Sequence, residues 1–117
     1  MRAHLIQFEI EWEAKQANFD RVERLLSRAS PGAGDLVVFP EMFDTGFSFN
    51  IEATADANGQ TLRYLLQLAE DLGVTVQGSR TVHQCHCSHA KNHATVAGPG
   101  GTILADYAKI HPFSYGK

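Results

Sequence analysis

The first half of the chain alternates between strand-like and helix-like spacings of its apolar residues. Residues 3–10 alternate imperfectly between apolar and polar side chains, which predicts an opening strand. Over residues 13–29 the apolar positions recur at spacings of three and four, which predicts a helix that a segment rich in Pro and Gly at 30–34 ends. The apolar run at residues 36–39 is too short for a helix and predicts a strand covered on both faces.

The second half predicts one further helix and three further strands. Apolar residues at helical spacing mark a helix over residues 61–72, and Gly73 is placed to end it. Residues 74–79 predict a third strand, residues around 93–96 a fourth and residues 102–107 a fifth, with a tight glycine-rich turn between the last two.

This order of elements predicts an α/β (α+β) fold with a mixed sheet. Strand–helix–strand crossovers join parallel strands and tight connections join antiparallel ones, so the first three strands should be parallel and the later ones antiparallel, with helices packed on one face at least. The other face of such apolar strands also needs a cover. We expect residues beyond Lys117, or a partner, to provide it.

Composition narrows the class of protein. The 117 residues are 44% hydrophobic and 20% charged, with a formal net charge of −3, which gives no basic footprint for nucleic acid. No apolar run has the length of a membrane span and no secretory signal is recognisable, so we expect a cytoplasmic protein without membrane contact. Cys85 and Cys87 are too close in sequence for an unstrained disulfide, which fits reduced thiols.

The first candidate for chemistry is Glu41, which follows the buried strand at 36–39. Proline cannot donate to a ladder, so Pro40 stops the strand and delivers Glu41 at its end. Aromatic and apolar neighbours would withdraw the carboxylate from water and suit it to accepting a proton as a general base. The plainer alternative is a solvated surface carboxylate.

The second candidate is Lys109, which follows the fifth strand as Glu41 follows the second. Opposite charges at the ends of neighbouring strands can face one cleft, where a lysine stabilises an oxyanion while a carboxylate accepts a proton. The alternative is an exposed lysine. Four further residues are candidates for binding substrate, with packing in the core or in a loop as their alternative: Phe43, Phe47, His111 and Phe113.

These segments together resemble a known family. Residues 39–43 with 45–47 look like the catalytic-glutamate motif of the nitrilase superfamily of carbon–nitrogen hydrolases, and residues 107–113 look like its catalytic-lysine motif. The two motifs at this spacing, with matching elements between them, are more specific than either alone. The chain is similar to the family at further positions: Glu11, Trp12, Glu13, Asn18, Gly78, Ser79, Asn92, Val96, Pro99 and Gly101.

The resemblance implies a fold and a chemistry. It implies a four-layer αββα sandwich and a Cys–Glu–Lys triad that hydrolyses a small-molecule amide or nitrile without a cofactor or metal, in a protein that is at least a dimer. Carried over, Glu41 is the base and Lys109 the electrostatic stabiliser.

The nucleophile is where the sequence departs from the pattern. In the family the cysteine lies on a strand-to-helix turn well after the lysine motif, and this chain stops at Lys117. We therefore expect residues 1–117 to be the N-terminal part of a single hydrolase domain, truncated before the nucleophile and without turnover on its own. Cys85 and Cys87 are poor substitutes, because nothing near them suggests a helix N-terminus that would favour a thiolate.

Two other classes of function stay open. One is a catalytically inactive fragment that persists as a binding or assembly module and buries its open sheet face against a partner. The other is a metal-binding hairpin at residues 83–93, which hold four histidines and both thiols but lack the usual ligand spacing of a zinc site.

Overall fold

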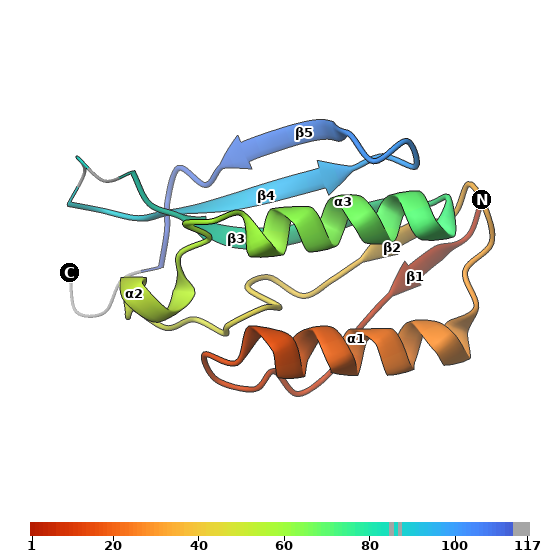
Figure 1. The fold of residues 1–117 in the computed structure, drawn as a ribbon, viewed down its shortest axis with the longest axis horizontal. Helices are drawn as coiled ribbons and strands as arrows, with labels where there is room; N and C mark the ends of the chain where they lie inside the picture. The colour runs from red at the N-terminus through yellow and green to blue at the C-terminus, as the bar shows by residue number, and fades with distance from the viewer. Residues whose placement is uncertain (85, 87, 114–117) are drawn as a thin grey trace.

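The computed structural model describes residues 1–84, 86 and 88–113. Three helices and five strands follow one another along the chain (Figure 1), in the order β1 (Ala3–Leu5), α1 (Lys15–Ala29), β2 (Leu36–Val38), α2 (Ile51–Thr54), α3 (Gln60–Leu72), β3 (Thr75–Val82), β4 (Lys91–Ala97) and β5 (Ile103–Ala108).

The strands form one mixed sheet in the order of the sequence, β1-β2-β3-β4-β5. β2 pairs in parallel with both β1 and β3, whereas β4 pairs antiparallel with both β3 and β5. The mixed α/β sheet predicted from the crossovers and tight connections is confirmed.

The boundaries of β1 and β3 differ most from the prediction, α1 begins two residues later than predicted, and the short helix α2 was not predicted. β1 ends at Leu5, because the chain leaves the sheet after one more hydrogen bond, from Ile6 N–H to the Val38 carbonyl. β3 runs on to Val82, three residues beyond its predicted end. The added residues include the polar Arg80 and Thr81, which are buried at 8% exposure each by contacts that a hydrophobic pattern does not reveal.

The long helices α1 and α3 pack against one face of the sheet. Phe19 of α1 and Tyr64 of α3 stack with ring centroids 4.1 Å apart. Both helices share one core with the sheet, formed by Phe19, Val22, Leu26, Val37, Phe39, Phe43, Leu65, Leu68, Ala69, Val74, Val76 and Ala97. Gly73 ends α3 in a left-handed conformation, as its position predicts.

The strand register separates the two faces. Val37, Val76 and Ala97 are paired side by side on neighbouring strands and are fully buried beneath the helices. Because successive side chains of a strand point to opposite faces, the next row lies on the other face. That row crosses all five strands and is partly or fully exposed: Leu5, Val38, Gln77, Val96 and Ala105.

Candidate active site

The topology brings three strand ends to one edge of the sheet. β2 and β5 both end there, because β5 is antiparallel to β4 and β4 is antiparallel to β3. β4 begins at the same edge. Glu41 after β2, Asn92 at the start of β4 and Lys109 after β5 therefore meet, although 68 positions separate the first from the last.

Glu41 receives two hydrogen bonds on the same oxygen. Lys109 Nζ and Asn92 Nδ2 each lie 2.7 Å from Glu41 Oε1. The Lys109 backbone N–H also donates to the Asn92 carbonyl, at 2.8 Å. Asn92 thus fixes both members of the ion pair, and Glu41 Oε2 is left without a hydrogen-bond partner among the residues described.

A tight turn presents Glu41. Met42 adopts a left-handed conformation with φ of 55°, which is uncommon for a residue with a side chain. Its N–H donates to the buried hydroxyl of Ser79 at 2.6 Å, and its carbonyl accepts the N–H of Gly46 at 2.8 Å. Ser79, on β3, therefore holds the backbone directly after the carboxylate. Sequence reasoning gave neither Ser79 nor Asn92 a role, although both belong to the resemblance.

The pair lies at a cavity of about 280 Å³. The cavity is lined from the sheet face that the helices leave uncovered, by Phe39, Glu41, Gln77, Ser79, Asn92, Ala94, Tyr107 and Lys109. The side chains of Glu41 and Lys109 are 43% and 38% exposed. The expectation of a carboxylate withdrawn from water thus does not hold for the described chain, where solvent reaches both charges.

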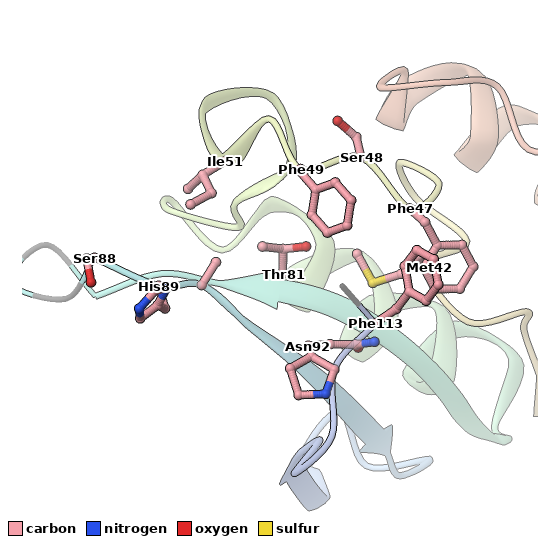
Figure 2. A pocket seen from close by; sticks show the side chains of 12 residues that line it. Met42, Phe47, Ser48, Phe49, Ile51, Thr81, Ser88, His89, Asn92 and Phe113 are labelled. Atoms are coloured by element: carbon pink, nitrogen blue, oxygen red, sulfur yellow. The ribbon is translucent and has the colours of Figure 1, made fainter. Parts of the chain in front are cut away.

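A second cavity of about 340 Å³ adjoins the first, and Asn92 lines both. Phe47 and Phe113 lie on its wall, as Figure 2 shows. Phe43 does not, because its ring is fully buried in the core, 4.7 Å from that of Phe39. His111 is exposed and lines neither cavity. For these two residues the geometry favours the alternative already named, packing for Phe43 and a loop position for His111.

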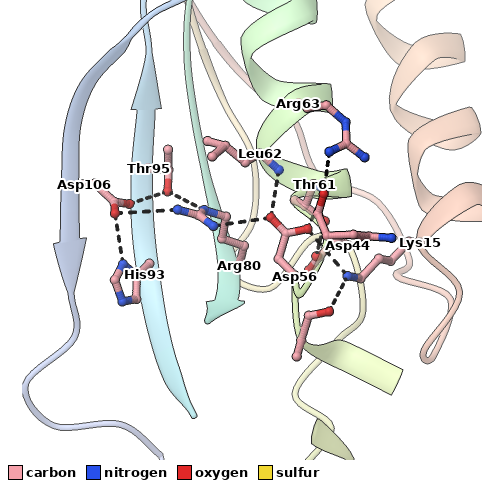
Figure 3. A network of polar contacts seen from close by, with 12 residues as sticks. Lys15, Asp44, Asp56, Thr61, Leu62, Arg63, Arg80, His93, Thr95 and Asp106 are labelled. Atoms are coloured by element: carbon pink, nitrogen blue, oxygen red, sulfur yellow. Dashed lines mark hydrogen bonds and ion pairs between the residues drawn. The ribbon is translucent and has the colours of Figure 1, made fainter. Parts of the chain in front are cut away.

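A buried polar network lies on the helix side of the sheet (Figure 3). Arg80 contacts Asp56 at 3.3 Å and Asp106 at 3.6 Å, and it donates to Thr95. Burial opposes ionisation of Asp106, but hydrogen bonds from Thr95 and His93 and the charge of Arg80 outweigh it and lower the pKa of Asp106 below its ordinary value. The network ties β3, β4 and β5 together behind the site.

Asp44 is the one ionisable group near the site with a strongly raised pKa among those described. Burial raises the pKa of Asp44 to about 6, and a hydrogen bond from the Thr61 hydroxyl offsets only part of that effect. Its backbone carbonyl accepts a hydrogen bond from Asn18. Asp44 therefore anchors the loop after Glu41 to both long helices.

Within residues 1–84, 86 and 88–113, no group of three or more His, Cys, Asp or Glu side chains could hold a metal ion. His93, one of the histidines of the 83–93 segment, pairs with Asp106 at 3.1 Å. Cys85 and Cys87 lie outside the described residues, so neither their expected inertness nor a metal-binding role is tested. In the same part of the chain, no helix has the length and hydrophobicity needed to cross a membrane.

The Glu41 carboxylate could accept a proton, and the Lys109 ammonium beside it could stabilise negative charge. A carboxylate oxygen without a partner can take a proton from a group placed in the cavity, and an ammonium 2.7 Å from the other oxygen can stabilise negative charge that develops nearby. A side chain that could attack a substrate carbon as a thiolate is not present at this cavity among the described residues.

Known proteins are similar to this chain in sequence and in structure. The family model for carbon–nitrogen hydrolases matches residues 2–117. A nitrilase of Pyrococcus abyssi is 34% identical over 102 residues, which cover 82% of this chain and 38% of the relative. An omega-amidase of Xenopus laevis is 29% identical over 111 residues, 93% of this chain and 40% of the relative.

A solved structure agrees with the sequence relatives. The CN-hydrolase superfamily protein of Xanthomonas campestris, which carries an arsenic adduct in its active site, superposes with a TM-score of 0.80 at 32% identity. The match covers 95% of this chain and 41% of that one, so the chain spans about two fifths of the length of the proteins it resembles. By sequence and by structure, the chain belongs to the carbon–nitrogen hydrolase family.

Proposed function

We propose that the chain contributes the base and the stabilising cation of a hydrolase that cleaves the carbon–nitrogen bond of a small-molecule amide or nitrile. The observation that carries the proposal is the contact of 2.7 Å between Lys109 Nζ and Glu41 Oε1 at the mouth of a cavity, made by the two residues that the family motifs single out. Names of relatives such as nitrilase and omega-amidase support the same class of reaction.

The proposed triad would be completed by a cysteine that follows Lys117 in the whole hydrolase domain, rather than by Cys85 or Cys87. For an amide, Glu41 takes the thiol proton as the sulfur bonds to the carbonyl carbon, and Lys109 stabilises the oxyanion. The C–N bond breaks, the protonated Glu41 gives its proton to the leaving nitrogen, and a thioester remains. Water then attacks the thioester carbon while Glu41 takes its proton, and the sulfur leaves and regains that proton.

The wider organisation belongs to the same proposal. Residues 1–117 would form the N-terminal part of a single domain, with a second sheet and helical layer completing an αββα sandwich over the exposed row of Leu5, Val38 and Val96. The half-exposed ion pair supports this, because a carboxylate and an ammonium that act on substrate need a drier setting than the described chain gives them. A cytoplasmic homo-oligomer that uses no cofactor is the corresponding expectation for the whole protein.

Substitution of Lys109 tests the proposal. In the naturally occurring full-length protein, Lys109→Met removes the ammonium but keeps an aliphatic chain of similar length. We expect release of ammonia from a panel of small amides and nitriles to fall by at least about 100-fold, the scale of losing one electrostatic stabiliser. Lys91→Met is the matched control, since Lys91 is exposed and lines neither cavity. Equal activity of the two variants would contradict the role of Lys109.

A further inference from the structure

The aromatic cavity, the second cavity described above, opens beside the ion pair. Met42 on its wall directly follows Glu41, and Asn92 on its wall donates to Glu41 Oε1. A molecule that presents its carbonyl carbon near Glu41 therefore extends any substituent on this side into the aromatic cavity. Its volume of about 340 Å³ is at the small end of the roughly 300–1,000 Å³ typical of ligand sites.

The walls of the aromatic cavity are mainly apolar. They include three phenyl rings, those of Phe47, Phe49 and Phe113, together with the side chains of Met42 and Ile51. The rings lie together on one side in Figure 2, away from Ser88 and His89. Surfaces of this kind bind apolar groups by removing their area from water, with aromatic rings adding specific edge or face contacts.

The segments that carry the two charged residues also build this wall. Phe49 lies in the loop after Glu41, and Phe113 lies in the segment after Lys109. Their rings stack with centroids 6.3 Å apart and planes 12° apart. The apolar wall and the ion pair are thus held by the same two chain segments, which makes the cavity part of one site.

No carboxylate, ammonium or guanidinium lines the aromatic cavity among the residues described. The hydroxyl of Ser48 on its wall already bonds to Glu13. Lys109 and Glu41, which line the adjoining cavity, already bind each other. Among the described lining residues, His89 is the one whose side chain can carry a charge, and it lies away from the three rings (Figure 2). A charged substituent held against the rings would lose part of its hydration without gaining a counter-ion, which is costly, whereas an uncharged apolar one would not.

We propose that the aromatic cavity selects amides and nitriles with an uncharged apolar substituent, aromatic or branched aliphatic, and discriminates against substrates that carry a carboxylate at the same position. This inference rests on the proposed function and specifies its substrate class.

The test compares phenylacetamide with succinamic acid, a small amide that carries a carboxylate, in the full-length protein. We expect kcat/KM for phenylacetamide to exceed that for succinamic acid by at least about 10-fold, the scale on which an apolar pocket discriminates between substrates. Phe49→Ala and Phe113→Ala should each lower kcat/KM for phenylacetamide by about 5-fold, the scale of one aromatic contact. Both rings are more than half exposed, so truncating them leaves the core intact.

Leu104→Ala is the matched control, because Leu104 is similarly exposed and lines neither cavity. Preference for succinamic acid, or unchanged kcat/KM for phenylacetamide in both Phe variants, would overturn the inference. If neither compound nor any other amide or nitrile is hydrolysed, the proposed function fails. Binding of phenylacetamide, followed by ligand-observed NMR, then decides the inference: it stands if the Phe variants lose binding that Leu104→Ala keeps, and falls otherwise.

Discussion

Asn92 shows how one residue, through its side chain and its backbone, can set the geometry of the ion pair. Its side-chain amide donates to Glu41 Oε1, and its backbone carbonyl accepts the backbone N–H of Lys109. One residue at the start of β4 therefore determines where both charged residues lie. Both donors that the described residues supply to Glu41 use the same oxygen, which leaves the other oxygen for the proton transfer proposed above. Asn92 is a positioning residue in this account, since it acts through Glu41.

Asp44 gives the protein a dependence on pH of predictable sign. Its pKa rises from 3.8 to about 6 on folding, so between these values the folded state holds a proton that the unfolded state has lost. Stability from this residue is therefore present below about pH 4 and is lost as pH rises to about 6. Relative to Asp44→Asn, we expect the free energy of unfolding of the wild type to fall by about 2 kcal/mol over this interval.

Urea denaturation at several pH values measures this difference. Asp71→Asn is the matched control for the substitution itself, because it replaces the same type of side chain at an exposed position at the end of α3. If Asp44→Asn and wild type show parallel curves of stability against pH, Asp44 does not titrate as the buried geometry implies.

At the scale of single residues, the sequence predicted the charged pair but not its support. Glu41 and Lys109 were identifiable because each follows an apolar strand and lies in a recognisable motif. The roles of Asn92 and Ser79 depend on the register of β4 and on the left-handed turn at Met42, which no local pattern of hydrophobicity specifies. Phe43 and Phe47 lie in one short loop. Only the packing shows that Phe43 belongs to the hydrophobic core, whereas Phe47 lines the second cavity.

α3 begins on a cap that lies outside the helix. Asp56 accepts the N–H of Thr61 at 2.8 Å and of Leu62 at 3.0 Å, and the same carboxylate pairs with Arg80. Its side chain is fully buried. The helical spacing of apolar residues predicted the body of α3. Its cap was not predictable in this way, because Asp56 lies four residues before the first helical residue and a turn that ends at Gly59 separates the two.

Removing this cap should destabilise the fold strongly. Asp56→Ala leaves two N–H groups of α3 unsatisfied and the guanidinium of Arg80 buried with only Asp106 as an ion partner. We expect the free energy of unfolding to fall by at least about 3 kcal/mol, the scale of breaking a buried pair. Asp71→Ala, at the exposed end of the same helix, should cost less than about 1 kcal/mol. Similar denaturation midpoints for the two variants would rule out a capping role.

On the scale of the whole molecule, one face of the sheet is packed and the other is not. The helices bury Val37, Val76 and Ala97, while the row that includes Leu5, at 77% exposure, and Val96 lies open. The site lies on this open face, so a layer packed on the face, as proposed above, would also close the cavity around Glu41 and Lys109. The spacing of apolar residues predicted the mixed sheet and the need for a second layer on its open face. It does not specify which segment or partner would form that layer.

The most direct measurement is release of ammonia by the full-length protein and its Glu41→Gln variant, which keeps the size of the side chain and removes the base. We expect hydrolysis of a small amide or nitrile by the wild type and a loss of at least about 100-fold in Glu41→Gln. The control Glu52→Gln, whose side chain is exposed on α2, should keep its activity. Full activity of Glu41→Gln would contradict the assignment of the base. Absence of hydrolysis by the wild type would contradict the proposed hydrolase function and favour a binding or assembly module.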